Sequence, residues 1–72
     1  MKDFIIGTKL KLARVENDLT QGELADLVDV TRQTIGLIES GKYNPTLKLC
    51  LLLASVTGKT LDELFWIEGE IV

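Results

Sequence analysis

Four threonines mark the expected starts of helices, because each stands directly before a run of apolar residues at helical spacing. They are Thr20, Thr31, Thr46 and Thr60. A threonine hydroxyl in this place can accept a hydrogen bond from one of the first free amides of a helix. A glutamate follows three residues after the first and the last of these threonines, which is the pattern of a capping box. The chain is therefore expected to form several short helices with well-defined starts.

Turn residues between the apolar runs separate five expected helices. We expect them at about residues 3–16, 20–29, 31–40, 47–56 and 60–66. Gly41 ends the third, since glycine readily takes the left-handed conformation that follows a helix. Pro45 disfavours helical geometry in the loop residue Asn44. The tail, residues 67–72, has no clear assignment. The sequence predicts an all-α fold, a compact five-helix bundle that forms a single domain over residues 1–72.

Apolar residues at spacings of three and four indicate one buried face on each of the first three segments. The first segment has Ile6, Leu10 and Ala13, the second has Leu24, Leu27 and Val28, and the third has Ile35 and Ile38. A domain of 72 residues buries only about 60% of the surface that its unfolded chain exposes. The fold therefore depends on an efficient core, and the 46% hydrophobic content is consistent with one.

The residue content excludes several classes of function. The chain has no histidine and one cysteine, Cys50, so it can build neither a histidine metal site nor a Ser-His or Cys-His catalytic pair. The longest apolar run, residues 49–54, is far shorter than the roughly 20 residues of a membrane span. The charged N-terminus lacks the apolar core of an export signal. We expect a cytoplasmic protein that is not an enzyme and has no cofactor, metal or small-molecule ligand.

Negative charge gathers at the C-terminal end of the chain. The net charge is −3, and four acidic residues, Asp62, Glu63, Glu68 and Glu70, lie in the last thirteen residues, where there is no lysine or arginine. Residues 1–59 carry eight basic and seven acidic side chains. The overall acidity therefore says little about the charge of any one face, although most nucleic-acid-binding domains are more basic.

The second and third expected helices meet at a short turn, which is the arrangement of a helix-turn-helix. A small residue, Ala25, falls where the two helices would cross, and small side chains let backbones approach closely. Residues 19–45, LTQGELADLVDVTRQTIGLIESGKYNP, resemble the phage-repressor helix-turn-helix family, the Cro-like or xenobiotic-response-element type. The similarity covers roughly residues 5–66, with the motif at about residues 20–40. It implies a lambda-repressor-like DNA-binding domain.

The resemblance assigns base reading to the start of the third expected helix. Arg32 and Gln33 would contact base edges in the major groove of double-stranded DNA. Their chemistry suits this role, because arginine pairs with guanine O6 and N7, and glutamine with adenine N6 and N7. Each such pair is worth about 1–3 kcal/mol of discrimination. The alternative is an ordinary solvated helix face.

Further contacts and one ion pair are also implied by the resemblance. The residues that would contact the DNA backbone, or a thymine methyl group in the case of Thr34, are Gln21, Thr31, Thr34, Lys42, Tyr43 and Asn44. The tyrosine ring alternatively packs on its own loop. Arg14 and Glu39 would form a structural ion pair between the first and third helices.

Two positions depart from the family pattern. The turn residue that is often glycine in the family is Asp29 here, and aspartate tolerates the left-handed region better than most residues. Gly36 and Leu37 occupy a stretch where a polar base-reading side chain is often found. Gly36 costs roughly 1 kcal/mol relative to alanine inside a helix. It either admits a close approach of DNA or reads nothing.

The resulting interpretation is a sequence-specific transcriptional regulator, a repressor that binds an operator as a homodimer. The apolar helix at residues 47–56 and the C-terminal helix and tail, residues 60–72, would form the dimer contact, unless their side chains only close the monomer core. The alternative function is a protein-interaction module, an antitoxin-like or adaptor protein that binds a partner through its acidic C-terminal segment.

Overall fold

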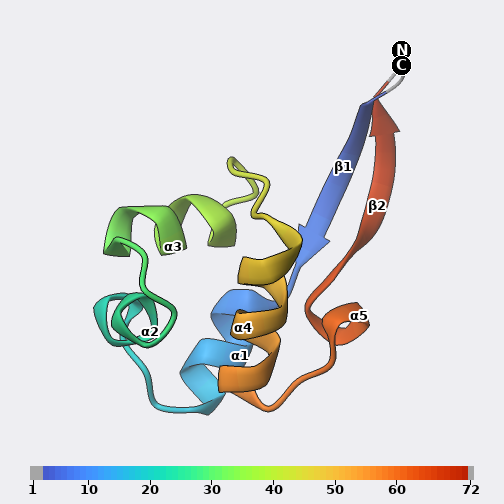
Figure 1. The fold of residues 1–72 in the computed structure, drawn as a ribbon. Coiled ribbons are helices and arrows are strands. Elements are labelled where there is room, and N and C mark those ends of the chain that lie inside the picture. Colours follow the sequence, from blue (N-terminus) through green and yellow to red (C-terminus); the bar gives the residue numbers. More distant parts are fainter. Residues whose placement is uncertain (1–2, 72) are drawn as a thin grey trace.

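The computed structural model describes residues 3–71, with side-chain surroundings from residue 6 to residue 69, and places five helices and a two-stranded sheet in this part of the chain (Figure 1). The elements are β1 Asp3–Thr8, α1 Leu10–Glu16, α2 Gln21–Leu27, α3 Arg32–Glu39, α4 Leu47–Thr57, α5 Leu61–Leu64 and β2 Phe65–Ile71. The five-helix bundle with its helix-turn-helix is confirmed. The sheet is an addition that an all-α fold does not contain.

The first helix begins later than the apolar spacing indicated. The prediction of one helix over residues 3–16 was wrong for its first half, where Asp3–Thr8 forms β1. Gly7 lowers helix stability, and the β-branched residues beside it fit a strand. Ile6 therefore belongs to the sheet, whereas Leu10 enters the core.

The last helix ends earlier than expected, because α5 stops at Leu64 and the chain continues directly into β2. Phe65 and Trp66, expected in the helix, are the first residues of this strand. The strand also accounts for the unassigned tail as far as residue 71. It pairs antiparallel with β1, so segments from the two ends of the chain lie side by side and run away from the helices (Figure 1). The pairing is irregular between Ile5 and Ile6.

Trp66 covers the one glycine of β1. It stands opposite Gly7 in the antiparallel register, and a Cβ atom placed on this glycine would collide with the indole and with the Glu68 carboxylate. The missing side chain therefore makes the room that the ring occupies. On the neighbouring α1 side, the Lys9 ammonium lies 5.9 Å from the ring centroid, a cation–π distance.

The core lies among the five helices. Its fully buried large side chains are Leu10, Leu24, Ile35, Ile38, Leu53 and Leu64, so every helix contributes at least one. The expectation that Leu27 lies on the buried face of α2 was wrong, because its side chain is 57% exposed, whereas the next residue, Val28, is buried. Because α3 contributes two isoleucines, its inner face is fixed by packing and its opposite face is turned outward.

The threonines act as helix caps, with one difference at the last. Thr20 Oγ1 accepts from the Glu23 amide at 3.0 Å, and Glu23 Oε1 accepts from the Thr20 amide at 2.9 Å, a complete capping box. Thr31 and Thr46 accept through their hydroxyls from the third residue that follows each. The Thr60 hydroxyl instead donates to carboxylates, while Glu63 accepts from the Thr60 amide at 2.8 Å.

Candidate nucleic-acid interface

A tight turn sets the angle between α2 and α3. Ala25 is buried, and its carbonyl accepts a hydrogen bond from the Val30 amide at 3.0 Å, which closes the turn against α2. Asp29 has φ of 60°, the left-handed conformation that this position requires. Aspartate adopts it with less strain than most residues. The small alanine and the left-handed turn residue together present α3 as the outer helix of the pair (Figure 1).

The N-terminal end of α3 presents two unengaged polar side chains. Arg32 and Gln33 are its first two residues, and both are exposed. Neither side chain makes a hydrogen bond or ion pair among the residues that the structure describes. Their guanidinium and amide groups are therefore available to a ligand outside the chain.

The hydroxyl groups of Thr31 and Thr34 are engaged with each other at the start of the helix. Thr31 Oγ1 accepts from the Thr34 amide at 3.2 Å, and the two hydroxyl oxygens are 2.9 Å apart. Thr31 is exposed and Thr34 is half-buried. The pair holds the first turn of α3, and with it the backbone that carries Arg32 and Gln33.

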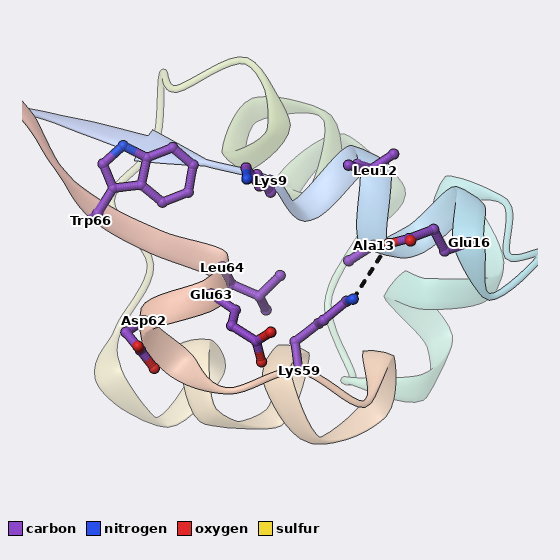
Figure 2. Close-up of a pocket in the computed structure, with 9 residues that line it drawn as sticks. All are labelled: Lys9, Leu12, Ala13, Glu16, Lys59, Asp62, Glu63, Leu64 and Trp66. Atoms are coloured by element: carbon purple, nitrogen blue, oxygen red, sulfur yellow. Dashed lines mark ion pairs between the residues drawn. The ribbon is translucent and has the colours of Figure 1, made fainter.

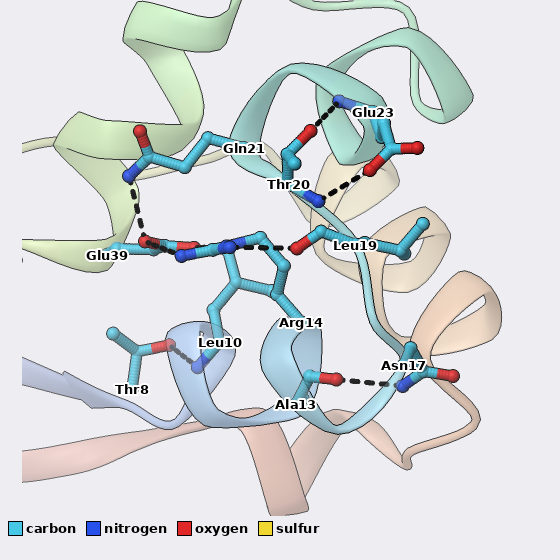
Figure 3. A network of polar contacts seen from close by, with 10 residues as sticks. All are labelled: Thr8, Leu10, Ala13, Arg14, Asn17, Leu19, Thr20, Gln21, Glu23 and Glu39. Carbon is cyan, nitrogen blue, oxygen red and sulfur yellow. Dashed lines mark hydrogen bonds and ion pairs between the residues drawn. The ribbon is translucent and has the colours of Figure 1, made fainter.

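A polar network fastens the other end of α3 to α1 and α2 (Figure 3). The Arg14 Nε atom lies 2.7 Å from Oε2 of Glu39, and both side chains are largely buried. Arg14 also donates to the Leu19 carbonyl at 2.8 Å. Gln21 donates from Nε2 to Oε1 of Glu39 at 3.0 Å, a contact that the sequence did not indicate. One glutamate thereby connects three helices.

The loop after α3 carries the remaining expected contact residues. Gly41 has φ of 74°, and the Lys42 amide donates to the Leu37 carbonyl at 2.9 Å, which ties the start of the loop to the helix. Lys42, Tyr43 and Asn44 are all exposed. An eight-residue helix is roughly 12 Å long, so Lys42, in the loop beyond the end of α3, is far from Arg32 at its start.

An open hollow lies on the outer face of α3. It is lined by Gln21, Arg32, Gln33, Gly36 and Leu37 and measures about 460 Å³. The expected base-reading residues and the expected backbone contact Gln21 thus border one concavity. Leu37 also lines this hollow, because its position four residues after Gln33 places the two on one side of a helix.

A second hollow, of about 340 Å³, lies between α1, α5 and β2 (Figure 2). Its charges are mixed: Lys59 pairs with Glu16 at 3.6 Å, and Lys9 lies on the same wall as Trp66.

The described residues contain no group of three or more acidic or cysteine side chains that could hold a metal ion. Over residues 3–71, no helix has the length and apolar character needed to cross a membrane.

Comparison with known proteins agrees with this geometry. The family model described as Helix-turn-helix matches residues 10–64. An uncharacterized HTH-type transcriptional regulator of Methanocaldococcus jannaschii is 44% identical over 62 residues, which cover 86% of this chain and 94% of that protein. One from Archaeoglobus fulgidus is 41% identical over 63 residues and covers 88% and 89% of the two chains.

Solved structures with the same arrangement include two regulators. The restriction-modification controller protein C.AhdI of Aeromonas hydrophila has a TM-score of 0.69 and 31% identity, over 75% of this chain and 82% of that one. The clp gene regulator ClgR of Corynebacterium glutamicum, at 20% identity, shares the fold with a TM-score of 0.71 over 75% and 57%. The chain belongs to the helix-turn-helix family of DNA-binding transcriptional regulators, a family of non-enzymes.

Proposed function

We propose that the protein binds double-stranded DNA sequence-specifically by inserting α3 into the major groove. The observation that carries this proposal is the contrast between the two ends of α3. Glu39 at one end is fixed to two other helices, whereas Arg32 and Gln33 at the other end are exposed and make no hydrogen bond or ion pair with the residues that the structure describes. A rigid helix with free guanidinium and amide groups suits bidentate contacts to guanine and adenine.

The surrounding polar residues would position this helix on the duplex. Gln21 uses one N–H of its side-chain amide for Glu39, which leaves the second N–H for a phosphate oxygen. Thr31 and Thr34 flank the base readers, and Lys42 with its neighbours Tyr43 and Asn44 would contact the backbone beyond the other end of α3. Such contacts fix orientation and carry no sequence information themselves.

We propose a homodimer that represses transcription from a two-fold symmetric operator. On the exposed surface of α4, Leu47 is 64% exposed and Leu51, one turn later, is 51% exposed. This face, together with residues 60–72, is our proposed contact between protomers. Half-sites about 10 bp apart would place both copies of α3 on one side of the duplex. A dimer bound to the operator would then repress by blocking other proteins from the same stretch of DNA. We place this action in the cytoplasm.

Sedimentation analysis at micromolar concentration tests the dimer. We expect the mass of two chains for the wild type and of one chain for Leu51→Lys. A wild type that sediments as a monomer, both alone and with a two-half-site duplex, would contradict the dimer.

The alternative of a protein-interaction module has less support. It rests on the acidic C-terminal segment, where Asp62 and Glu63 are exposed but already accept hydrogen bonds from Thr60 at the start of α5. These carboxylates therefore serve the fold. We favour DNA as the ligand.

Selection from randomised duplexes, followed by binding measurements at several salt concentrations, tests the proposed function. We expect an enriched sequence and a binding constant that falls linearly with salt on logarithmic axes, with a slope that reflects the phosphates contacted. A steep salt slope without any enriched sequence would reduce the protein to an electrostatic binder. Absence of binding at low salt would leave the interaction module as the better account.

A further inference from the structure

Gly36 lies in the interior of α3, where glycine lowers helix stability relative to alanine. Packing within the chain does not require it. A Cβ atom built on Gly36 would meet only Nε2 of Gln21, at 3.7 Å, which is an ordinary van der Waals contact. The protein thus has space for alanine at this position and leaves the space open. Contacts among the described residues therefore give no reason for a glycine at this position.

The open space belongs to the hollow on the outer face of α3. Gly36 forms part of its lining with bare backbone, and Leu37 beside it is 38% exposed. Gln33, exposed one turn before Leu37, borders the same hollow with an amide. A polar reader and an apolar surface therefore lie next to each other on the face that the proposed function directs at the bases.

We propose that this hollow receives the C5 methyl group of a pyrimidine and that Leu37 is a specificity-determining residue. The inference rests on the proposed function and names what that site reads. In the major groove, the C5 methyl is the apolar feature of a thymine, and 5-methylcytosine carries the same group. Contact with Leu37 and the Gly36 backbone removes this methyl and the leucine from water. A side chain on Gly36 would fill the space that the methyl needs.

Other occupants fit less well. The side-chain donors of the hollow belong to Gln21, Arg32 and Gln33, so a phosphate would bind at that polar part and leave the wall formed by Leu37 and Gly36 unused. A guanine edge presents acceptors that suit Arg32, at the beginning of the helix, and would leave Leu37 against polar atoms. A methyl group makes use of the apolar wall and leaves no polar group unpaired.

Single-methyl substitutions in the selected duplex test the proposal. Each thymine is replaced in turn by uracil, and each cytosine by 5-methylcytosine, with binding followed by fluorescence anisotropy at constant salt. For the wild type we expect one position per half-site to change affinity about fourfold, the effect of burying one methyl group. A loss with uracil identifies thymine as the source, and a gain with the modified cytosine identifies 5-methylcytosine.

Two variants assign the effect to the hollow. Leu37→Ala should bind methylated and unmethylated duplexes equally. Gly36→Ala should raise the thermal unfolding temperature and yet lose the methyl preference, which separates recognition from folding. Leu12→Ala, at a 56% exposed leucine of α1, is the matched control and should keep the wild-type preference.

The results distinguish this inference from the function on which it rests. If the protein selects a sequence but no methyl change alters affinity by more than about twofold, the inference is wrong and the proposed function stands. The same holds if Leu37→Ala retains the wild-type methyl preference. If no sequence is selected at all, both fail.

Discussion

The side-chain amide of Gln21 donates a hydrogen bond to the Glu39 carboxylate, from Nε2 to Oε1, over 3.0 Å. This contact joins the first residue of α2 to the last residue of α3, and Glu39 extends it to Arg14 on α1 (Figure 3). A residue proposed to contact DNA is thus also part of the network that holds the recognition helix. Under the proposed function, Gln21 would therefore contribute both to stability and to DNA binding.

Removing the charge of Glu39 should destabilise the fold. In Glu39→Gln, the largely buried Arg14 guanidinium loses its ionic partner, and the new amide offers it one uncharged acceptor oxygen where the carboxylate offered two. We expect the free energy of unfolding to fall by about 2–4 kcal/mol, measured by urea denaturation. Lys59→Ala is the control, because it breaks an ion pair that is much more exposed and spans 3.6 Å. This change should cost less than about 1 kcal/mol. Equal losses in the two variants would show that the buried pair has no special structural role.

Arg32→Ala and Gln21→Ala should alter DNA binding in different ways. Loss of Arg32 should relax the preference at one base pair by about 1–3 kcal/mol and leave the unfolding free energy unchanged, since its exposed side chain makes no described contact. Loss of Gln21 should weaken binding to all sequences alike and lower the unfolding free energy by about 1 kcal/mol. Binding to a panel of single-base variants, with urea denaturation in parallel, measures both effects. Uniform losses for both variants would contradict the assigned roles.

Gly7→Ala should displace the indole of Trp66, because the new Cβ would occupy the position of the ring. We expect a loss of about 1–3 kcal/mol in unfolding free energy and a red shift of tryptophan emission. The emission reports on this ring alone, since the chain has one tryptophan. Gly22→Ala is the control, because a Cβ there would meet only Thr20 Oγ1, at 4.0 Å. An unchanged emission spectrum in Gly7→Ala would refute the close packing of ring and strand.

Acid should weaken the starts of α2 and α5. The hydrogen bond from the Thr20 backbone amide lowers the pKa of Glu23 below its ordinary value of 4.5, and the Thr60 amide does the same for Glu63. A carboxylate with a lowered pKa in the folded state stabilises the fold above its unfolded pKa, and this stabilisation disappears as the pH falls through the folded value. We expect unfolding free energy to decline from about pH 5 downward.

Replacing both glutamates by glutamine should flatten this decline, as followed by urea denaturation at stepped pH values. Asp26→Asn is the control, because the exposed Asp26 side chain makes no hydrogen bond among the described residues. If the double variant shows the same decline as the wild type, the two caps are not its source.

The local features of this chain could be predicted from short stretches of sequence. Thr20 with Glu23 marks a helix start because both partners of the cap lie within four residues, and Gly41 marks a helix end through its own backbone freedom. Ile35 and Ile38 indicated the buried face of α3 through their spacing alone. For such features, the residues that interact are near neighbours in the chain.

Features that depend on distant partners were decided only by the tertiary structure. The segment Asp3–Thr8 is a strand because Phe65–Ile71, from the other end of the chain, supplies its backbone hydrogen bonds, and no periodicity within either segment reveals the partner. Gln21 donates to a carboxylate eighteen positions away, and its bonding was invisible until α2 and α3 were packed. The sequence by itself determined where helices start, stop and bury a face, since local geometry controls these events. Only the folded chain determined which polar side chains remain available to bind a ligand, because other polar side chains form hydrogen bonds or ion pairs with residues distant in the sequence.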